Sequence, residues 1–296
     1  MHIRIVSPSS VIDPKYIDGA QQVLQSWGHE VSIAPHAKGR YGGAAGTTEE
    51  RLQDLNDAFA DPSVDMILCS RGGYGLAQII DQVRVNPHKL LAGFSDITCL
   101  HCLCGKEGIP SLHSIMAKHI ATLPADSEPI KALRAVLSGE DIRYTLPLSP
   151  YSREGEAAGI LRGGNLSVFY GLQRTPFQVI DKDSILFIED IDEPQYHIDR
   201  MLQNLRLSGV MKNIKGLIVG QFSDCADDVE RMSCTLRETI SRASADYAYP
   251  VLTDFPAGHV ELNLPVFMNT PCHIKVEADK ALFTQTNPLN SLITPP

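Results

Sequence analysis

The chain has 296 residues, of which 43% are hydrophobic, so it can bury one large core or two moderate ones. A formal net charge of -9 without any run of Lys and Arg argues against nucleic acid or anionic membrane as partners and favours a small-molecule or peptide substrate. No apolar stretch reaches membrane-spanning length, and residues 1–7 lack the layout of a secretion signal. Together with seven scattered cysteines, typical of reduced thiols, these features predict a cytoplasmic protein.

The first half of the chain alternates short apolar strands with helical periodicity. This alternation predicts a doubly wound parallel sheet, in which ligands bind beyond the carboxyl ends of the strands. The loops after Ser7, Ser70 and Phe94 should therefore meet at one edge of the sheet. We expect strands over residues 2–6, 30–34, 65–70 and 90–92, and helices over residues 14–27, 47–60, 76–83 and 97–104.

The βα rhythm is interrupted at residues 141–156, where polar residues gather with Pro147, Pro150 and Gly155. We expect an α/β domain over residues 1–145, a linker over 146–156 and a second domain over 157–296. The second domain is predicted to be mixed α+β and barrel-like. Its expected strands cover residues 184–188, 216–221, 260–267, 273–277 and 281–284, and its expected helices cover residues 195–207 and 229–243.

A serine occupies the turn between an expected strand and an expected helix. Ser95 follows the apolar residues 90–92 and precedes the helical segment 97–104. Such a turn exposes the hydroxyl and directs backbone N–H groups of the helix towards it, which places a nucleophile beside an oxyanion site. The alternative is an ordinary N-cap formed by Ser95 or Asp96, because the chain has Ile where the usual nucleophile elbow has its last Gly.

Three other patterns are weaker indications of a binding site. The glycines of residues 71–75 allow a ligand to approach the backbone, but the loop lacks the Lys-Ser/Thr of a phosphate-binding P-loop. The cysteines at positions 99, 102 and 104 lie at mixed spacing in an apolar helix, which does not fit a zinc site. His113 and His119 are expected to be structural, and the sequence calls for no metal or organic cofactor.

A serine nucleophile requires a base and a group that orients the base. His259 is a candidate base because it follows Gly258 in a turn, and loops carry functional residues more often than cores do. Glu189 ends an apolar strand, so it could be buried and held rigid there. The alternative is that residues 189–193 form a solvated acidic cap on the next helix.

These motifs occur in the order found in the LD-carboxypeptidase family of serine peptidases, and the resemblance spans nearly the whole chain. It is carried by residues 70–75, 93–98, 162–166, 188–193 and 258–259. The resemblance implies a triad of Ser95, Glu189 and His259, with the serine on the N-terminal domain. It also implies oxyanion donors at the backbone N–H of Asp96 and of a glycine in the 71–75 loop, which we assign to Gly73.

The resemblance further implies a cytoplasmic homodimer that releases the terminal D-alanine from murein tetrapeptides during cell-wall recycling. The free carboxylate of such a substrate needs an Arg or backbone N–H groups, which the sequence does not locate. Residues 113–116 read His-Ser-Ile-Met where the family commonly has His-Gly-Pro-Met, so the pocket should differ there. Two alternatives stay open: a hydrolase of peptidyl-adenylate toxins, like the microcin immunity peptidases, and a ligand-binding protein in which Ser95 is only a cap.

Overall fold

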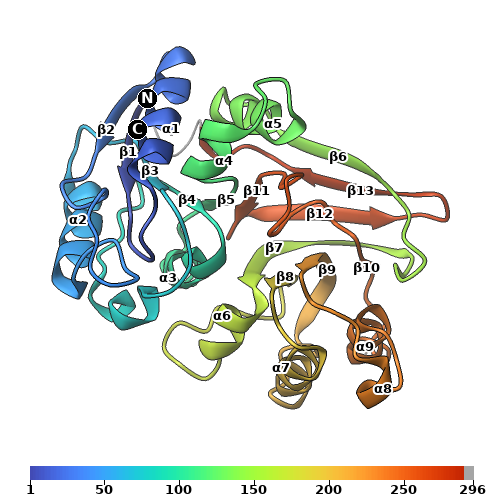
Figure 1. Ribbon diagram of the computed structural model, residues 1–296. Helices are drawn as coiled ribbons and strands as arrows, with labels where there is room; N and C mark the ends of the chain where they lie inside the picture. The colour runs from blue at the N-terminus through green and yellow to red at the C-terminus, as the bar shows by residue number, and fades with distance from the viewer. Residues whose placement is uncertain (290–296) are drawn as a thin grey trace.

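The computed structural model describes residues 1–289 and contains two β-sheets that lie side by side (Figure 1). The first sheet has six strands, and all neighbouring strands are parallel except β11 and β5. In spatial order its strands are β11 (Val266–Met268), β5 (Ser111–His113), β4 (Leu90–Gly93), β3 (Met66–Cys69), β1 (His2–Val6) and β2 (Glu30–Ile33).

Helices cover the first sheet, which is why β3 and β4 are buried along their whole length. The α-helices of this half are α1 (Pro14–Ser26), α2 (Thr48–Ala60), α3 (Thr98–Lys106), α4 (Ala117–Thr122) and α5 (Glu128–Leu137). Helix α2 begins with a capping box, in which the Thr47 hydroxyl accepts from the Glu50 backbone and the Glu50 carboxylate accepts from the Thr47 backbone.

The second sheet has seven strands and mixed pairing. Strands β7 to β10 pair in parallel, whereas β12, β13 and β6 pair antiparallel with their neighbours. In spatial order the strands are β10 (Val251–Leu252), β9 (Ile214–Ser223), β8 (Ser184–Ile191), β7 (Gly155–Asn165), β12 (Pro271–Val276), β13 (Lys280–Gln285) and β6 (Ile142–Pro147). An isolated antiparallel bridge joins Arg153, which lies between β6 and β7 in the sequence, to Val251 of β10.

The fold class predicted from the sequence is confirmed, with a parallel-rich first sheet and a mixed second sheet. In the lower part of Figure 1, helices lie along one side of β8 and β9. They are α6 (Leu166–Gly171), α7 (Gln195–Leu207), α8 (Val229–Met232) and α9 (Leu236–Ala243). No helix within residues 1–289 combines the length and the apolar character needed to cross a membrane.

The chain exchanges strands between the two sheets. Strand β6 begins at residue 142 and pairs with β13 of the second sheet, so the expected linker 146–156 starts inside a strand. Strand β11 follows β10 in the sequence but pairs with β5 of the first sheet. The division into domains at residues 146–156 stays a prediction.

Three expected elements differ from the structure. The expected helix 76–83 consists of two 3-10 turns, η1 (Leu76–Gln78) and η2 (Ile80–Gln82), because Ile79 has a non-helical backbone. The expected helix 229–243 breaks at Ser233, whose φ of 56° is left-handed, and Thr235 caps a new helix. The expected strand 260–267 is reduced to β11, because backbone groups of residues 256–264 bond to each other in local turns.

Gln285 anchors the outer edge of β11. Its side chain accepts a hydrogen bond from the Phe267 backbone N–H at 2.8 Å and donates one to the Phe267 carbonyl at 2.6 Å. Gln285→Leu should lower the free energy of unfolding by about 1 to 3 kcal/mol, because the buried Phe267 N–H loses its partner and the Phe267 carbonyl keeps only the Thr270 hydroxyl. Urea unfolding measures this loss. The matched control Gln25→Leu, on the exposed face of α1, should change stability by less than about 0.5 kcal/mol. Equal effects of the two substitutions would contradict the role of Gln285.

Candidate active site

Ser95 lies on a strained turn between β4 and α3. Its φ of 69° is in the left-handed region, which a non-glycine residue adopts at a cost of about 1 to 3 kcal/mol. The 3-10 turn η3 (Ser95–Ile97) and helix α3 both lack a side-chain cap, so Ser95 does not act as an N-cap. Its half-buried hydroxyl makes no hydrogen bond to any residue in the described part of the chain. The turn therefore presents this hydroxyl to the space in front of it.

The side chain of Asp96 forms hydrogen bonds that connect three loops behind Ser95. Its buried carboxylate accepts a hydrogen bond from the Ser9 hydroxyl at 2.6 Å and from the Leu76 backbone N–H at 3.0 Å. Burial raises the pKa of this carboxyl group. The loops that follow β1, β3 and β4 thus meet at one edge of the sheet, as the sequence predicts.

The loop after β3 passes directly over the serine. A Cβ on Gly72 would lie 2.7 Å from the Cβ of Ser95, and a Cβ on Gly73 would lie 2.2 Å from the Ser10 hydroxyl. Gly73 also has a φ of 106°, which only glycine adopts readily. The two glycines are needed because the backbone approaches its neighbours this closely.

Glu189 and His259 are in contact, although 70 residues separate them in the sequence. The Nδ1 atom of His259 lies 2.7 Å from Oε2 of Glu189, which is fully buried near the end of β8. A Cβ on Gly258 would lie 3.0 Å from the same oxygen, so glycine at this position permits the contact. The interpretation of Glu189 as a solvated acidic cap is wrong, because its side chain has no exposure to solvent.

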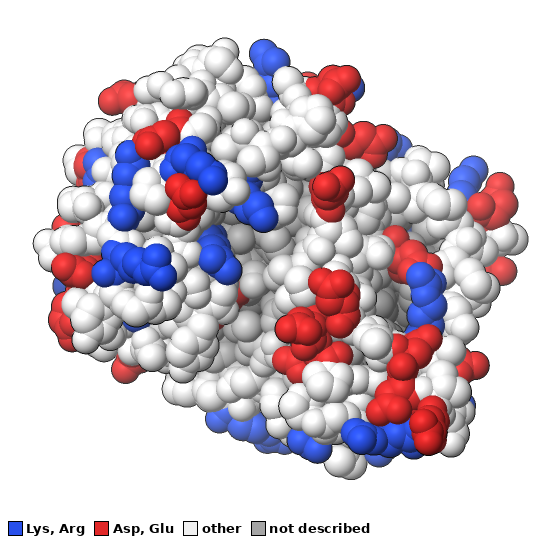
Figure 2. All heavy atoms as spheres, in the orientation of Figure 1, with Lys and Arg blue, Asp and Glu red and all other residues white. Residues whose placement is uncertain are grey.

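Ser95 and His259 line the same pocket, which has a volume of about 570 Å³. The ring of Phe94, the residue before the serine, lies 4.8 Å from the His259 ring. Within residues 1–289 no hydrogen bond joins the Ser95 hydroxyl to His259. Figure 2 shows the surface hollowed at the centre of the view, with Lys and Arg mainly on its left and Asp and Glu mainly on its right.

A buried polar link connects the serine turn to the strand that carries Glu189. The Asn165 backbone N–H donates to the Thr98 hydroxyl at 2.9 Å, and the Asn165 side chain donates to Asp190 at 2.8 Å. Burial raises the pKa of Asp190 to about 6. Sequence reasoning missed this link, and the only available signal was the motif of residues 162–166, which contains Asn165.

Three other residues considered in the sequence analysis, His113, His119 and Cys102, lie in environments that differ from one another. His113 is fully buried, and burial lowers its pKa far below the usual range, as expected of a structural residue. His119, in contrast, lines the pocket together with Met116 and Lys118, so the divergent segment 113–116 leads directly into the pocket wall. Burial raises the thiol pKa of Cys102 to about 12, which makes it a poor metal ligand.

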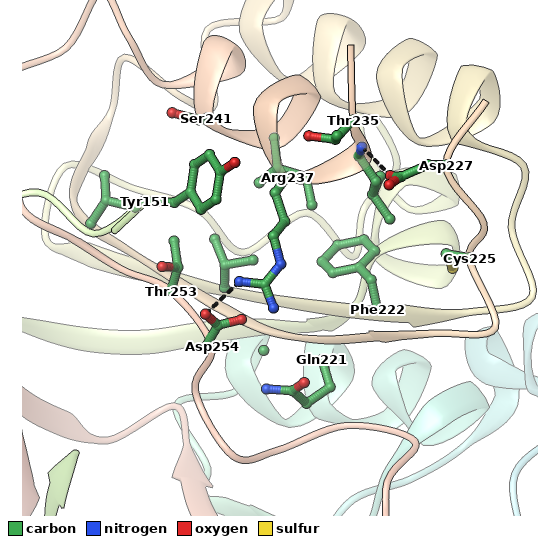
Figure 3. Close-up of a pocket in the computed structure, with 15 residues that line it drawn as sticks. Tyr151, Gln221, Phe222, Cys225, Asp227, Thr235, Arg237, Ser241, Thr253 and Asp254 are labelled. Atoms are coloured by element: carbon green, nitrogen blue, oxygen red, sulfur yellow. Dashed lines mark hydrogen bonds and ion pairs between the residues drawn. The ribbon is translucent and has the colours of Figure 1, made fainter. Parts of the chain in front are cut away.

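A second pocket of about 320 Å³ lies against β9, α9 and β10 (Figure 3). Arg237 reaches across it to Asp254, at 2.6 Å, and the Asp227 carboxylate accepts a hydrogen bond from the Leu236 backbone N–H. None of the site residues predicted from the sequence lines this pocket. Of the predicted residues, Ser95, Gly73 and His259 line the pocket around Ser95, whereas Glu189 and Asp96 are buried behind it.

A serine on a strained strand-to-helix turn, in one pocket with a histidine that a buried carboxylate holds, is typical of serine hydrolases. The family models of the LD-carboxypeptidase N-terminal domain and C-terminal domain match residues 3–114 and 158–274. A probable murein peptide carboxypeptidase of Bacillus subtilis is 33% identical over 89% of this chain and 85% of that protein. The chain therefore belongs to the LD-carboxypeptidase family.

Solved structures agree with this assignment. The crystal structure of muramoyltetrapeptide carboxypeptidase from Oxalobacter formigenes has a TM-score of 0.85 and 25% identity, and the match covers 96% of this chain and 98% of that one. The structure of MccF in complex with glutamyl sulfamoyl guanosine has a TM-score of 0.82 over 97% of this chain and 96% of that one. At 18% identity, the MccF match shows a shared fold only.

Asp190 should make the stability of the protein depend on pH. Its pKa is about 6 in the folded chain against an ordinary value of 3.8, so the folded state binds more protons between these limits. The free energy of unfolding should therefore fall by about 3 kcal/mol as the pH rises from about 4 to about 6. Urea unfolding at several pH values measures this fall, which should be much smaller in Asp190→Asn. Equal pH slopes in the two proteins would show that another group titrates.

Proposed function

We propose that this protein is a serine-type LD-carboxypeptidase that releases the terminal D-alanine from murein tetrapeptides by cutting an L-to-D peptide bond. The proposal is carried by the 2.7 Å contact between His259 and the buried Glu189, in a pocket that Ser95 also lines. The names of the B. subtilis relative and the O. formigenes structure, at 33% and 25% identity, support the substrate class.

In the proposed reaction Ser95 attacks the scissile carbonyl while His259 accepts the hydroxyl proton. His259 then donates this proton to the nitrogen of the leaving D-alanine. Glu189 keeps the proton of the neutral ring on Nδ1 and stabilises the imidazolium that forms during attack. Because Glu189 is fully buried, water screens its charge little, and the stabilisation is correspondingly large. Substrate binding brings the serine hydroxyl within hydrogen-bond distance of the ring.

The proposed oxyanion donors are the backbone N–H groups of Gly73 and Asp96. Gly73 lines the pocket beside Ser95, and Asp96 directly follows the nucleophile. The Asp96 carboxylate is buried and accepts hydrogen bonds from the Ser9 hydroxyl and the Leu76 backbone N–H. Each donor should stabilise the transition state by about 3 kcal/mol.

We further propose that the reaction takes place in the cytoplasm, on muropeptides recycled from the cell wall, and that the protein acts as a homodimer. All seven cysteines are free thiols, which suits a reducing compartment. Fractionation of cells and light scattering of the purified protein test the location and the oligomeric state.

Mass spectrometry of purified protein incubated with tetrapeptides tests the reaction class. We expect tripeptide and free D-alanine, with diaminopimelate and lysine compared at the third position of the substrate. Ser95→Ala should lower kcat by about four orders of magnitude or more, and Glu189→Gln by about 10³ to 10⁴, because each removes part of one catalytic unit. Unchanged turnover in Ser95→Ala would contradict the proposed mechanism.

Gly72→Ala should impair catalysis without unfolding the protein. The added Cβ would lie 2.7 Å from the Cβ and 2.9 Å from the Oγ of Ser95, so the nucleophile must move. We expect kcat/KM to fall about 100-fold, because small misplacements of reacting groups are costly. The matched control is Gly43→Ala, where a Cβ meets no atom within 4 Å. Comparable losses in both variants would argue against close contact as the cause.

Hydrolysis of a peptidyl-nucleotide toxin is the second candidate function, favoured by the shared fold with MccF. The only tryptophan of the chain, Trp27, follows α1 and does not line the pocket around Ser95. An aminoacyl-sulfamoyl adenylate assayed beside the tetrapeptide separates the two activities. A ligand-binding protein without catalysis would bind the tetrapeptide and turn over neither compound.

A further inference from the structure

Helix α4 places two polar side chains on the wall of the Ser95 pocket. Both Lys118 and His119 line the pocket. The Phe94 ring lies 6.0 Å from the His119 ring and 4.8 Å from the His259 ring, so one aromatic side chain contacts both histidines. His119 therefore lies in the part of the pocket near the proposed base, and Lys118 lies next to it on the same wall.

Within residues 1–289, neither the Lys118 ammonium group nor the Nδ1 atom of His119 has a polar partner. Lys118 is exposed and makes no ion pair within residues 1–289, and Nδ1 of His119 is buried without a hydrogen bond. Burial lowers the pKa of His119, and the proximity of Lys118 and of His259 lowers it further, against a smaller opposing effect of Glu261. The ring is thus neutral near pH 7, and a proton on Nε2 avoids a buried, unpaired N–H at Nδ1.

The direction of proton transfer defines which part of the substrate lies here. In the proposed reaction His259 gives its proton to the leaving nitrogen, so the released residue must lie on the His259 side of Ser95. In that residue the carboxylate carbon and the leaving nitrogen are bonded to the same Cα, so the carboxylate must also lie on the His259 side. The other cation of the pocket, Arg71, donates to the Val11 carbonyl at 2.8 Å and belongs to the glycine loop with Gly73.

We propose that Lys118 and His119 bind the terminal carboxylate of the substrate and thereby restrict the enzyme to C-terminal residues. Lys118 supplies the positive charge, and the Nε2–H of His119 donates a hydrogen bond to the same group. Two cationic side chains, Arg71 and Lys118, line the pocket, which favours an anionic group there despite the net charge of -9. The inference rests on the proposed carboxypeptidase function.

The test compares a tetrapeptide with a free C-terminal carboxylate to the same peptide with a C-terminal amide. We expect the wild-type protein to prefer the acid by about 100-fold in kcat/KM, mainly through KM. Lys118→Met should reduce this preference about tenfold or more, whereas Lys118→Arg should keep most of it. His119→Phe should also reduce it, and His119→Gln, which retains a donor, should restore part of it.

Matched controls separate recognition from folding. Lys131→Met and His88→Phe alter exposed residues outside the pocket and should leave the preference for the acid unchanged. The inference would be overturned if the preference for the acid persisted in Lys118→Met and His119→Phe. It would also be overturned if Arg71→Met were the only variant that lost this preference. A wild-type protein that cleaves acid and amide equally well would also overturn it.

Binding measurements keep this inference distinct from the proposed function. Calorimetry with Ser95→Ala, which cannot form an acyl-enzyme, compares the affinities for the acid and the amide without turnover. If the wild-type protein cleaves neither peptide, the proposed function fails. In that case acid-selective binding that Lys118→Met abolishes would still support the carboxylate site, and unselective or undetectable binding would refute it.

Discussion

A hydrogen bond from the Asn165 backbone N–H to the Thr98 hydroxyl joins the two halves of the candidate active site. Thr98 lies three residues after Ser95, while the Asn165 side chain reaches Asp190 beside Glu189. Because Gly164 lacks a Cβ, which would lie 2.6 Å from the Thr98 hydroxyl, β7 can approach α3 this closely. The serine turn and the strand of Glu189 are thus held in one register by buried polar contacts.

Glu189 and Asp190, which are adjacent in β8, contact different residues because successive side chains of a strand point to opposite faces. Glu189 contacts His259, whereas Asp190 receives hydrogen bonds from Asn165 and from the backbone of Ser167. Burying two neighbouring carboxyl groups is unfavourable unless each has partners. The raised pKa of Asp190 and the unpaired Oε1 of Glu189 show that this cost is only partly offset.

The sequence predicts those features that depend on local patterns. The alternation of strands and helices, the capping box at Thr47 and the serine turn all follow from neighbouring residues, and the structure contains them. Long-range contacts leave no such pattern. The pairing of Glu189 with His259 was expected only from a family resemblance, the link through Asn165 was missed, and the broken helix at Ser233 follows from a backbone angle that no periodicity encodes.

Strand β11 has a consequence for how this polypeptide matures on the ribosome. The edge of β5 receives its partner only from residues 266–268, which are translated long after β5 itself. Until then the nascent sheet exposes an unpaired border, which is prone to aggregation. Ser95, the proposed nucleophile, is translated well before the segment that contains both His259 and β11, so the proposed triad can assemble only after that segment has been synthesised.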